Sequence, residues 1–306
     1  MTQRTEPEAR QDKPEGIGSP RKTKELLQKH GFSFKKSLGQ NFLIDGNILR
    51  NIADAADLTP TKGALEIGPG AGALTEKLAE RSGRVVAIEI DQRLLPMLED
   101  SLSGYPNVTI VHGDVLKVDL RALFREQFDG LDGVSVVANL PYYITTPIVM
   151  KLLEERLPVE SIVVMIQKEV ADRFAAPPGS KDYGSLSVAV QYYAVPEVVA
   201  KVPHTVFIPQ PNVDSAVIKL KMRSAPPVDV KDEALFFDVV QAAFAQRRKT
   251  LLNNLQQRFF AESGGKEACR AFLEGCGIAP ERRGETLSLS EYAAIANALH
   301  ERSPGV

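Results

Sequence analysis

A side-chain amide, a proline and a phenol follow one another in the segment Asn139-Leu140-Pro141-Tyr142, directly after a run rich in valine. The Asn139 side-chain oxygen and the Leu140 carbonyl oxygen could accept hydrogen bonds from the two N–H groups of an exocyclic amine. Such a grip would aim the nitrogen lone pair at an electrophile and stabilise the positive charge that develops on nitrogen. Pro141 fixes the local backbone, and Tyr142 offers a ring face on which a base can stack. These residue types favour methyl transfer to an adenine N6 amine without a strong general base.

A glycine-rich turn lies earlier in the chain, within EIGPGAGALT. Gly68, Gly70 and Gly72 let the backbone turn tightly and approach a ligand at the start of a helix. Together with Ala73, the glycines also satisfy the dinucleotide fingerprint G-x-G-x-x-A. Glycine spacing alone therefore leaves the cofactor open.

Carboxylates stand at three expected strand ends, namely Glu66, Glu89 and Asp114. Each one alone could simply cap a strand or a helix, but the carboxyl ends of neighbouring parallel strands share one crevice. A ligand with an amine, a ribose diol and an adenine would use all three acids, whereas a pyrophosphate would face the negative charge of Glu66. The acids therefore favour S-adenosylmethionine as the cofactor.

The elements that must position these residues follow from hydrophobic patterning. Short β-branched runs alternate with amphipathic stretches, which predicts an α/β fold with a mostly parallel, doubly wound sheet of seven strands. The expected buried strands are 63–68, 84–90, 107–114, 133–139 and 161–167. Two further runs, 186–194 and 214–222, are expected to form an antiparallel pair that closes one edge. Helices are expected at 73–82, 92–102 and 169–176, the second of them despite Pro96.

The chain is expected to divide into units of different character. The expected units are a disordered tail (1–20), a Rossmann-like methyltransferase domain (21–224), a linker (225–231) and a small all-α domain that binds RNA (232–306). Ser288 with Glu291 three residues later predicts a capping box at the start of the last helix.

The composition is that of an ordinary globular protein, with 43% hydrophobic and 25% charged residues. The two cysteines, Cys269 and Cys276, indicate a reducing compartment rather than a disulfide framework, and the four histidines lack metal-ligand spacing. No apolar stretch is long enough to span a membrane, and residues 1–20 lack the apolar core of a signal peptide. We therefore expect a cytoplasmic monomer without a metal.

Two local clusters of basic residues contrast with the formal net charge of −2. Lys35 and Lys36 end a basic N-terminal segment, and Arg247, Arg248 and Lys249 lie together in the C-terminal unit. Such patches suit contacts with RNA phosphates, although a solvated charged face is the alternative for any one of them.

A series of motifs in fixed order identifies a resemblance. The motifs are KKSLGQNFLID (35–45), EIGPGAGALT (66–75), AIEID (87–91), GD (113–114), NLPYYITTP (139–147), FIPQPNVDSAV (207–217) and QRRKTLLNNL (246–255). Together they resemble the small-subunit ribosomal RNA adenine dimethyltransferases, from about residue 24 to residue 299. The resemblance implies transfer of two methyl groups from S-adenosylmethionine, with S-adenosylhomocysteine as product, to N6 of each of two adjacent adenosines in the last hairpin loop of 16S rRNA. It also implies a role in biogenesis of the small ribosomal subunit.

The resemblance further implies roles for individual residues. It assigns Gln40, Asn41, Leu43, Glu66, Gly68, Gly70, Glu89, Ile90, Asp114, Val115 and Asn139 to the cofactor site. Asn139, Leu140 and Tyr142 would hold the target amine. Phe207 would stack on the target base from the other side, as in enzymes that flip a base. Tyr143 is a departure, because bacterial members often carry asparagine there, and it leaves the shape of the target pocket open.

Three alternatives share the glycine turn. A large-subunit rRNA adenine methyltransferase of the macrolide-resistance type usually has isoleucine at the position of Leu140 and lacks a clear QRRKTLLNNL. A non-catalytic assembly or transcription factor on the same fold would not need Asn139, Tyr142, Glu89 and Asp114 together. A nicotinamide-dependent oxidoreductase would explain the glycines but not residues 139–142.

Overall fold

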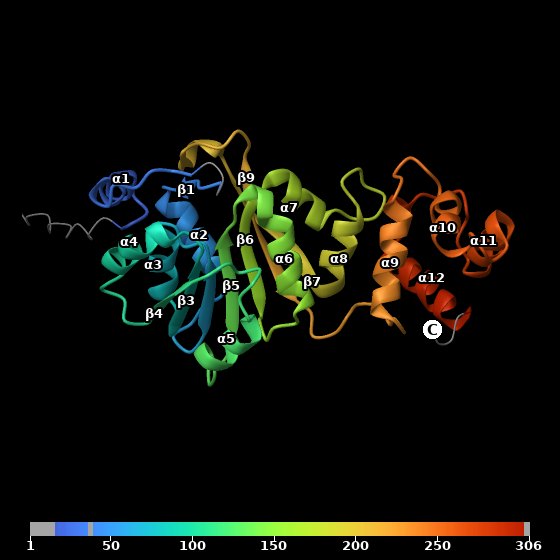
Figure 1. The fold of residues 1–306 in the computed structure, drawn as a ribbon, viewed down its shortest axis with the longest axis horizontal. Helices are drawn as coiled ribbons and strands as arrows, with labels where there is room; N and C mark the ends of the chain where they lie inside the picture. Colours follow the sequence, from blue (N-terminus) through green and yellow to red (C-terminus); the bar gives the residue numbers. More distant parts are fainter. Residues whose placement is uncertain (1–15, 36–38, 303–306) are drawn as a thin grey trace, which may run out of the picture.

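The fold is centred on a mostly parallel sheet. The computed structural model describes residues 16–35 and 39–302. Within them the strands of this sheet are β2 (Gly63–Ile67), β3 (Arg84–Glu89), β4 (Val108–His112), β5 (Val134–Asn139), β6 (Ser161–Gln167), β7 (Ala194–Val202) and β9 (Ser215–Met222). They lie side by side in the order β4-β3-β2-β5-β6-β9-β7 (Figure 1). The five strands from β4 to β6 are parallel, and β9 runs antiparallel to both of its neighbours. The predicted seven-stranded, mostly parallel sheet is confirmed.

A second, two-stranded sheet joins distant parts of the chain. It consists of β1 (Phe42–Leu43) and β8 (Phe207–Ile208), which pair antiparallel with Leu43 opposite Phe207. The pairing holds the N-terminal motif segment against the segment that follows β7.

The helices surround the large sheet and continue beyond it. They are α1 (Pro20–Lys29), α2 (Gly46–Ala55), α3 (Ala73–Ala79), α4 (Leu95–Ser101), α5 (Leu120–Gln127), α6 (Thr145–Glu154), α7 (Lys168–Ala175), α8 (Ser185–Tyr193), α9 (Glu233–Phe244), α10 (Leu251–Phe259), α11 (Gly265–Gly275) and α12 (Leu289–Arg302). Short 3-10 helices are η2 (Gln92–Leu94), η3 (Tyr142–Ile144), η4 (His204–Val206) and η5 (Gly284–Thr286). Pro96 lies in the first turn of α4, where a missing N–H does no harm.

Neighbouring residues of the central strands face different helical layers. Val136 of β5 packs in one apolar cluster with Phe124 of α5, whereas the next residue, Val137, packs in another with Ile52 of α2. Both residues are fully buried. Burial on both faces explains why these strands read as continuous apolar runs. The strand β4 differs, because it lies at the sheet edge and is only partly buried.

The prediction of a strand at 186–194 was wrong. Nearly all of this run forms α8, most of which is buried, and the partner of β9 is β7, which starts at Ala194. A helix that is enclosed on several sides shows no clear 3.6-residue periodicity, so its β-branched residues resemble a strand. The true strand contains Pro196, which only an edge strand tolerates.

The described part of the predicted tail is ordered. Residues 1–15 lie outside the described residues, but Ile17 is 5% exposed and its backbone N–H donates to Glu76 Oε2 over 3.2 Å. The Thr23 hydroxyl donates to the Ile17 carbonyl oxygen, and Ser19 caps α1 by accepting from the Lys22 N–H. The prediction of disorder was therefore wrong for residues 16–20.

The C-terminal segment is helical and packs beside α8, at the right-hand end of Figure 1. Phe236 of α9 and Ile295 of α12 belong to the same apolar cluster as the side chains that cover one face of the sheet. The capping box of α12 is confirmed, because the Ser288 N–H donates to Glu291 Oε2 and the Glu291 N–H to the Ser288 hydroxyl. Residues 223–232 connect β9 to α9 without a helix or strand. The unit boundaries at 225 and 231 stay predictions.

Replacing Ile17 by alanine tests how far the N-terminal segment contributes to folding. Because the Ile17 side chain is buried, its truncation should lower the free energy of unfolding by about 2 kcal/mol in urea denaturation. Val195→Ala is the matched control, since Val195 is 46% exposed on β7 and should change stability by less than about 0.5 kcal/mol. Equal effects of the two substitutions would contradict the packing described.

Candidate active site

One cavity lies at the carboxyl ends of β2, β3, β5 and the neighbouring β4. It is lined by every residue that the sequence assigned to the cofactor or to the target amine, namely Gln40, Asn41, Leu43, Glu66, Gly68, Gly70, Glu89, Ile90, Asp114, Val115, Asn139, Leu140, Tyr142 and Phe207. The parallel strands bring the acids and Asn139 together, and the β1–β8 pair adds Leu43 and Phe207. The individual roles of these residues stay predictions.

Glu66 is a buried carboxyl group with one unsatisfied oxygen. It is 1% exposed, and among the described residues Oε2 has no hydrogen-bond partner. Burial raises the pKa of Glu66 to about 8, the neighbouring Thr75 hydroxyl opposes this, and the Glu89 carboxylate adds to it. A buried acid without a partner is a strong candidate for contact with a cationic ligand group.

Glu89 is held by backbone donors at the end of β3. Its Oε1 accepts from the Asp91 N–H over 2.8 Å, and its Oε2 accepts from the Gly70 N–H over 3.3 Å. Burial raises the pKa of Glu89, and these two backbone hydrogen bonds counteract the shift. The glycine turn is tight here, because a Cβ at Gly70 would come within 3.0 Å of the Phe42 ring. The turn thus both orients Glu89 and leaves the backbone open to a ligand.

A polar network that sequence reasoning missed ties the lip of the cavity to β3. Gln40 Nε2 donates to Asp91 Oδ2 over 2.8 Å, and Gln40 Oε1 accepts from the Lys35 N–H. Asp91 also pairs with Arg93, whose guanidinium donates to the Ser33 carbonyl oxygen and lies over the Phe32 ring. Although burial opposes ionisation of Asp91, the hydrogen bonds from Arg93 and Gln40 hold its pKa below the ordinary value. The only signal in the sequence was the position of Asp91 two residues after Glu89.

Asn139 is fixed with its acceptor oxygen left for a ligand. Its Nδ2 donates to the Asn41 carbonyl oxygen over 3.2 Å, so the amide is oriented by the lip of the cavity. The Leu140 N–H donates to the Met165 carbonyl oxygen of β6, which fixes the following backbone. Tyr142 is partly buried, and its hydroxyl bonds to the Ser215 hydroxyl over 2.8 Å. Burial raises the pKa of Tyr142, so the ring is neutral at physiological pH.

Two further residues of the cavity lining are Asp114, which was predicted, and Thr23, which was not. Asp114 Oδ1 accepts from the Leu116 N–H over 3.0 Å, so one of its oxygens already closes a local turn. Thr23 of α1 lines the cavity with a 1% exposed side chain, although the sequence gave only the basic character of this helix.

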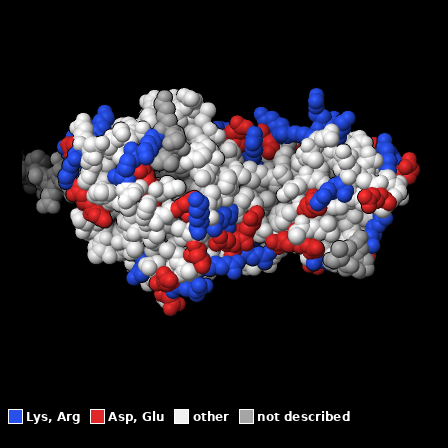
Figure 2. Space-filling model, in the orientation of Figure 1, with Lys and Arg blue, Asp and Glu red and all other residues white. Residues whose placement is uncertain are grey.

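The basic residues lie away from the base of the cavity. Lys35 is exposed beside its lip, and Lys36 lies outside the described residues. Arg247, Arg248 and Lys249 are exposed in the turn between α9 and α10. Figure 2 shows lysine and arginine side chains gathered over the upper end of α9, on the side of the molecule where the central strands end.

Neither a metal site nor a membrane-spanning helix is found in the part of the chain that the structure describes. No group of three or more His, Cys, Asp or Glu side chains is placed to hold a metal ion. None of the described helices combines the length and the apolar character needed to cross a bilayer.

Related proteins identify the family. A family model described as ribosomal RNA adenine dimethylase matches residues 31–301. The chain is 63% identical to a protein named ribosomal RNA small subunit methyltransferase A from Geobacillus thermodenitrificans (strain NG80-2), over 92% of this chain and 97% of that protein. It is 62% identical, over the same shares, to a protein of the same name from Geobacillus sp. (strain WCH70). The chain belongs to the ribosomal RNA adenine dimethylase family.

Solved structures share the fold of this dimethylase family member. A dimethyladenosine transferase from Plasmodium falciparum is 27% identical, with a TM-score of 0.69 over 83% of this chain and 95% of that one. The 23S rRNA methyltransferase ErmE is 26% identical, with a TM-score of 0.64 over 84% of this chain and 98% of that one. The predicted Rossmann-like, S-adenosylmethionine-dependent methyltransferase fold and the predicted enzyme class are confirmed.

Glu66→Gln should remove a pH-dependent loss of stability. Because folding raises the pKa of Glu66 from 4.5 to about 8, the unfolded chain ionises this group first as pH rises. Relative to the Gln variant, the free energy of unfolding of the wild-type protein should therefore fall by about 1.4 kcal/mol per pH unit between these two pKa values. Above the higher pKa it should fall no further. Urea denaturation across this range measures the difference.

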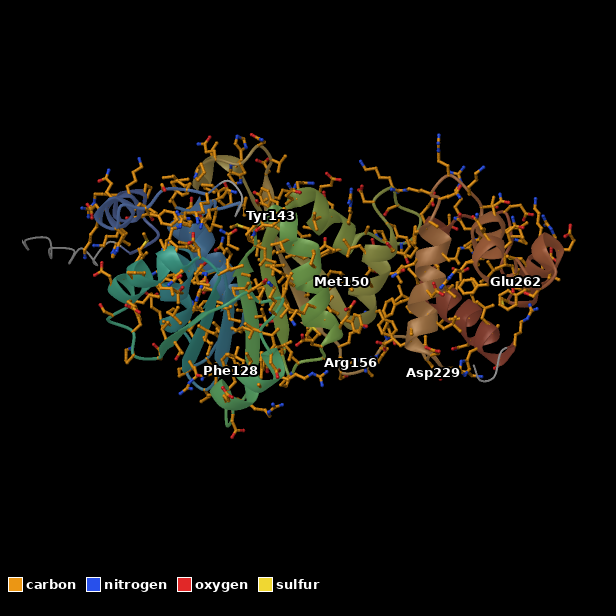
Figure 3. The ribbon with its side chains drawn as sticks, in the orientation of Figure 1. Phe128, Tyr143, Met150, Arg156, Asp229 and Glu262 are labelled. Carbon is orange, nitrogen blue, oxygen red and sulfur yellow. The ribbon has the colours of Figure 1, made fainter. Side chains whose placement is uncertain are left out.

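The matched control for this experiment is Glu262→Gln, an exposed acid near the start of α11 that Figure 3 labels. Because Glu262 is exposed, this substitution should change the free energy of unfolding by less than about 0.5 kcal/mol. A constant difference between the wild-type protein and Glu66→Gln over the same range would contradict the raised pKa of Glu66.

Proposed function

We propose that this dimethylase transfers methyl groups from S-adenosylmethionine to N6 of two adjacent adenosines in the 3′-terminal hairpin loop of 16S rRNA. It acts on the small ribosomal subunit during its biogenesis, as a cytoplasmic monomer and without a metal. The observation that carries the proposal is the anchored amide of Asn139. Its Nδ2 donates to the Asn41 carbonyl oxygen, and the residue lines a cavity shared with two buried acids. The names of the bacterial relatives support the small subunit as substrate over the large one.

The donor set of the cavity fits S-adenosylmethionine. The Glu66 carboxyl group would accept from the ammonium group of the methionine end, and this would relieve the cost of its burial. Glu89, already oriented by Asp91 and Gly70, would accept from the ribose hydroxyls. The apolar Ile90 and Val115 would flank the adenine. Asp114 Oδ2, which lies 3.7 Å from the exposed Lys117 ammonium, would accept from the adenine amine. When bound, the cofactor supplies a methyl group on a positively charged sulfur.

The chain's own groups would prepare the nucleophile. Asn139 Oδ1 and the Leu140 carbonyl oxygen would accept the two N–H groups of the target amine and turn its lone pair toward the methyl group. These acceptors are held before the reaction by Asn41 and Met165, so little reorganisation is needed as positive charge develops on nitrogen. After the first transfer the cationic nitrogen would release one proton to solvent. The N–H that remains could keep one hydrogen bond of the same grip, which is compatible with a second methylation.

Two aromatic rings would hold the flipped base. Tyr142 is fixed by Ser215 and Phe207 by the pairing of β8 with β1, and both line the cavity. The two residues reach the cavity from different elements, since Tyr142 follows β5 and the buried Phe207 begins β8. Rings placed in this way would exclude water and recover stacking energy that is lost when the base leaves its RNA loop.

The basic residues would contact the RNA backbone. Lys35 and Lys36 flank the cavity lip in sequence, and Arg247, Arg248 and Lys249 form an exposed cluster on the helical C-terminal segment. An acceptor as large as a ribosomal subunit can contact both clusters at once, and phosphate contacts of this kind make binding depend on salt.

Asn139→Ala tests the proposed mechanism. Removing one preorganised acceptor should lower kcat about 100-fold to 1,000-fold, while S-adenosylhomocysteine still binds. Methyl transfer to undermethylated small subunits measures the rate, and calorimetry measures the affinity. Glu89→Ala is the matched comparison, because it should weaken the affinity for S-adenosylhomocysteine instead. Full activity of Asn139→Ala would disprove the proposed grip on the amine.

A further inference from the structure

Tyr143 is an exposed aromatic residue at the mouth of the active-site cavity. Its side chain is 61% exposed, yet it lines the same cavity as Asn139 and Tyr142. The 3-10 turn η3 directs the two neighbouring tyrosines differently, because the partly buried Tyr142 bonds to Ser215 while Tyr143 faces solvent. Figure 3 labels Tyr143 at the upper end of the central strands, opposite the end where Phe128 lies.

Among the described residues, Gly39 lies close to the Tyr143 ring. A Cβ placed on Gly39 would lie 3.2 Å from Tyr143 Cε1 and 3.3 Å from Cδ1, so the ring packs directly against the glycine backbone. The same point lies 3.3 Å from the Cβ of Pro141. Gly39 has a φ of +58°, which a residue with a side chain would rarely adopt. The lip therefore supports one part of the ring while more than half of the side chain remains open to solvent.

We propose that Tyr143 is a positioning residue that stacks the nucleotide next to the target adenosine. This inference rests on the proposed function, because that substrate contains two adjacent adenosines. When one base occupies the cavity, the sugar–phosphate link keeps its neighbour within one nucleotide of the mouth, where the Tyr143 ring lies. Stacking on an exposed ring is a sequence-tolerant way to hold an unpaired base.

A flat ring at this position would also serve the change from the first adenosine to the second. Each adenosine must enter the cavity while the other waits outside, and the waiting base needs an apolar surface that makes no base-specific demand. Tyr143 offers such a surface in both arrangements, whereas Tyr142 and Phe207 lie within the cavity itself. Loss of the ring should therefore affect RNA binding and completion at both sites more than cofactor binding.

The test compares Tyr143→Ala, Tyr143→Leu and Tyr143→Phe with the wild-type enzyme on undermethylated small subunits. Tyr143→Leu keeps apolar contact with Gly39 but lacks a flat face, and Tyr143→Phe keeps the face without the hydroxyl. KM for subunits, kcat, affinity for S-adenosylhomocysteine, melting temperature and the methylation state of each adenosine are measured. Val198→Ala, an exposed apolar truncation on β7, is the control and should behave as wild type.

We expect Tyr143→Ala and Tyr143→Leu to raise KM for subunits about tenfold, the scale set by loss of one stacked base. At the time when the wild-type enzyme has dimethylated both adenosines, these variants should leave one adenosine incompletely methylated. Tyr143→Phe should keep the wild-type KM and the wild-type methylation of both adenosines. Cofactor affinity and melting temperature should be unchanged in all three variants.

Three results would overturn the inference. A wild-type KM and full dimethylation of both adenosines in Tyr143→Ala would show that the ring makes no contact with RNA. If KM rises in Tyr143→Ala but stays at the wild-type value in Tyr143→Leu, the effect comes from packing against Gly39. A loss of cofactor affinity in parallel with the rise in KM would also assign the effect to packing. Failure of the wild-type enzyme to methylate small subunits would instead disprove the proposed function, so the two failures are distinguishable.

Discussion

The parallel alignment of β3, β2 and β5 is the constraint on which the active site depends. Register pairs Glu66 with Val137 on one side and with Ala87 on the other, so the three strands end at the same level. The acid at the end of β3 and the amide at the end of β5 therefore meet Glu66 in one cavity. A slip of one residue in β2 would turn the Glu66 side chain away from this cavity. The apolar residues next to Glu66 in the strand would then face a polar site.

The site holds two carboxyl groups under conditions that disfavour their ionisation. Burial raises the pKa of both Glu66 and Glu89, and the charge of Glu89 adds to the shift of Glu66. Such an arrangement lowers the stability of the ligand-free protein at neutral pH. A ligand that carries an ammonium group and hydroxyl donors would relieve this cost, so the electrostatics favour the same class of cofactor as the geometry does. Stability given up in this way is typical of binding sites.

Much of the site could be predicted because its residues follow strands that the sequence marks clearly. Glu89 and Asn139 each end a buried, valine-rich strand, Glu66 is the last residue but one of the buried strand β2, and topology then dictates where they meet. The strand β7 escaped prediction, because Pro196 interrupts its pattern while the buried helix before it has the composition of a strand. Local patterns report burial and secondary structure, and they do not reveal which surface an element will cover.

Contacts between distant segments could not be predicted for a related reason. The Gln40–Asp91–Arg93 network and the burial of Ile17 against Glu76 depend on how the N-terminal segment folds over α3 and β3. Neither interaction leaves a periodic signal in the sequence. Tyr143 is a similar case, because only its placement against Gly39 shows that an exposed ring stands at the cavity mouth.

The most direct test of the account is methyl transfer from labelled S-adenosylmethionine to undermethylated small ribosomal subunits, with the products identified by mass spectrometry and mapped on the RNA. We predict N6,N6-dimethyladenosine at two adjacent positions near the 3′ end of 16S rRNA, with transfer nearly abolished by Asn139→Ala. Methylation confined to large-subunit RNA, or binding of small subunits without any methylation, would contradict it.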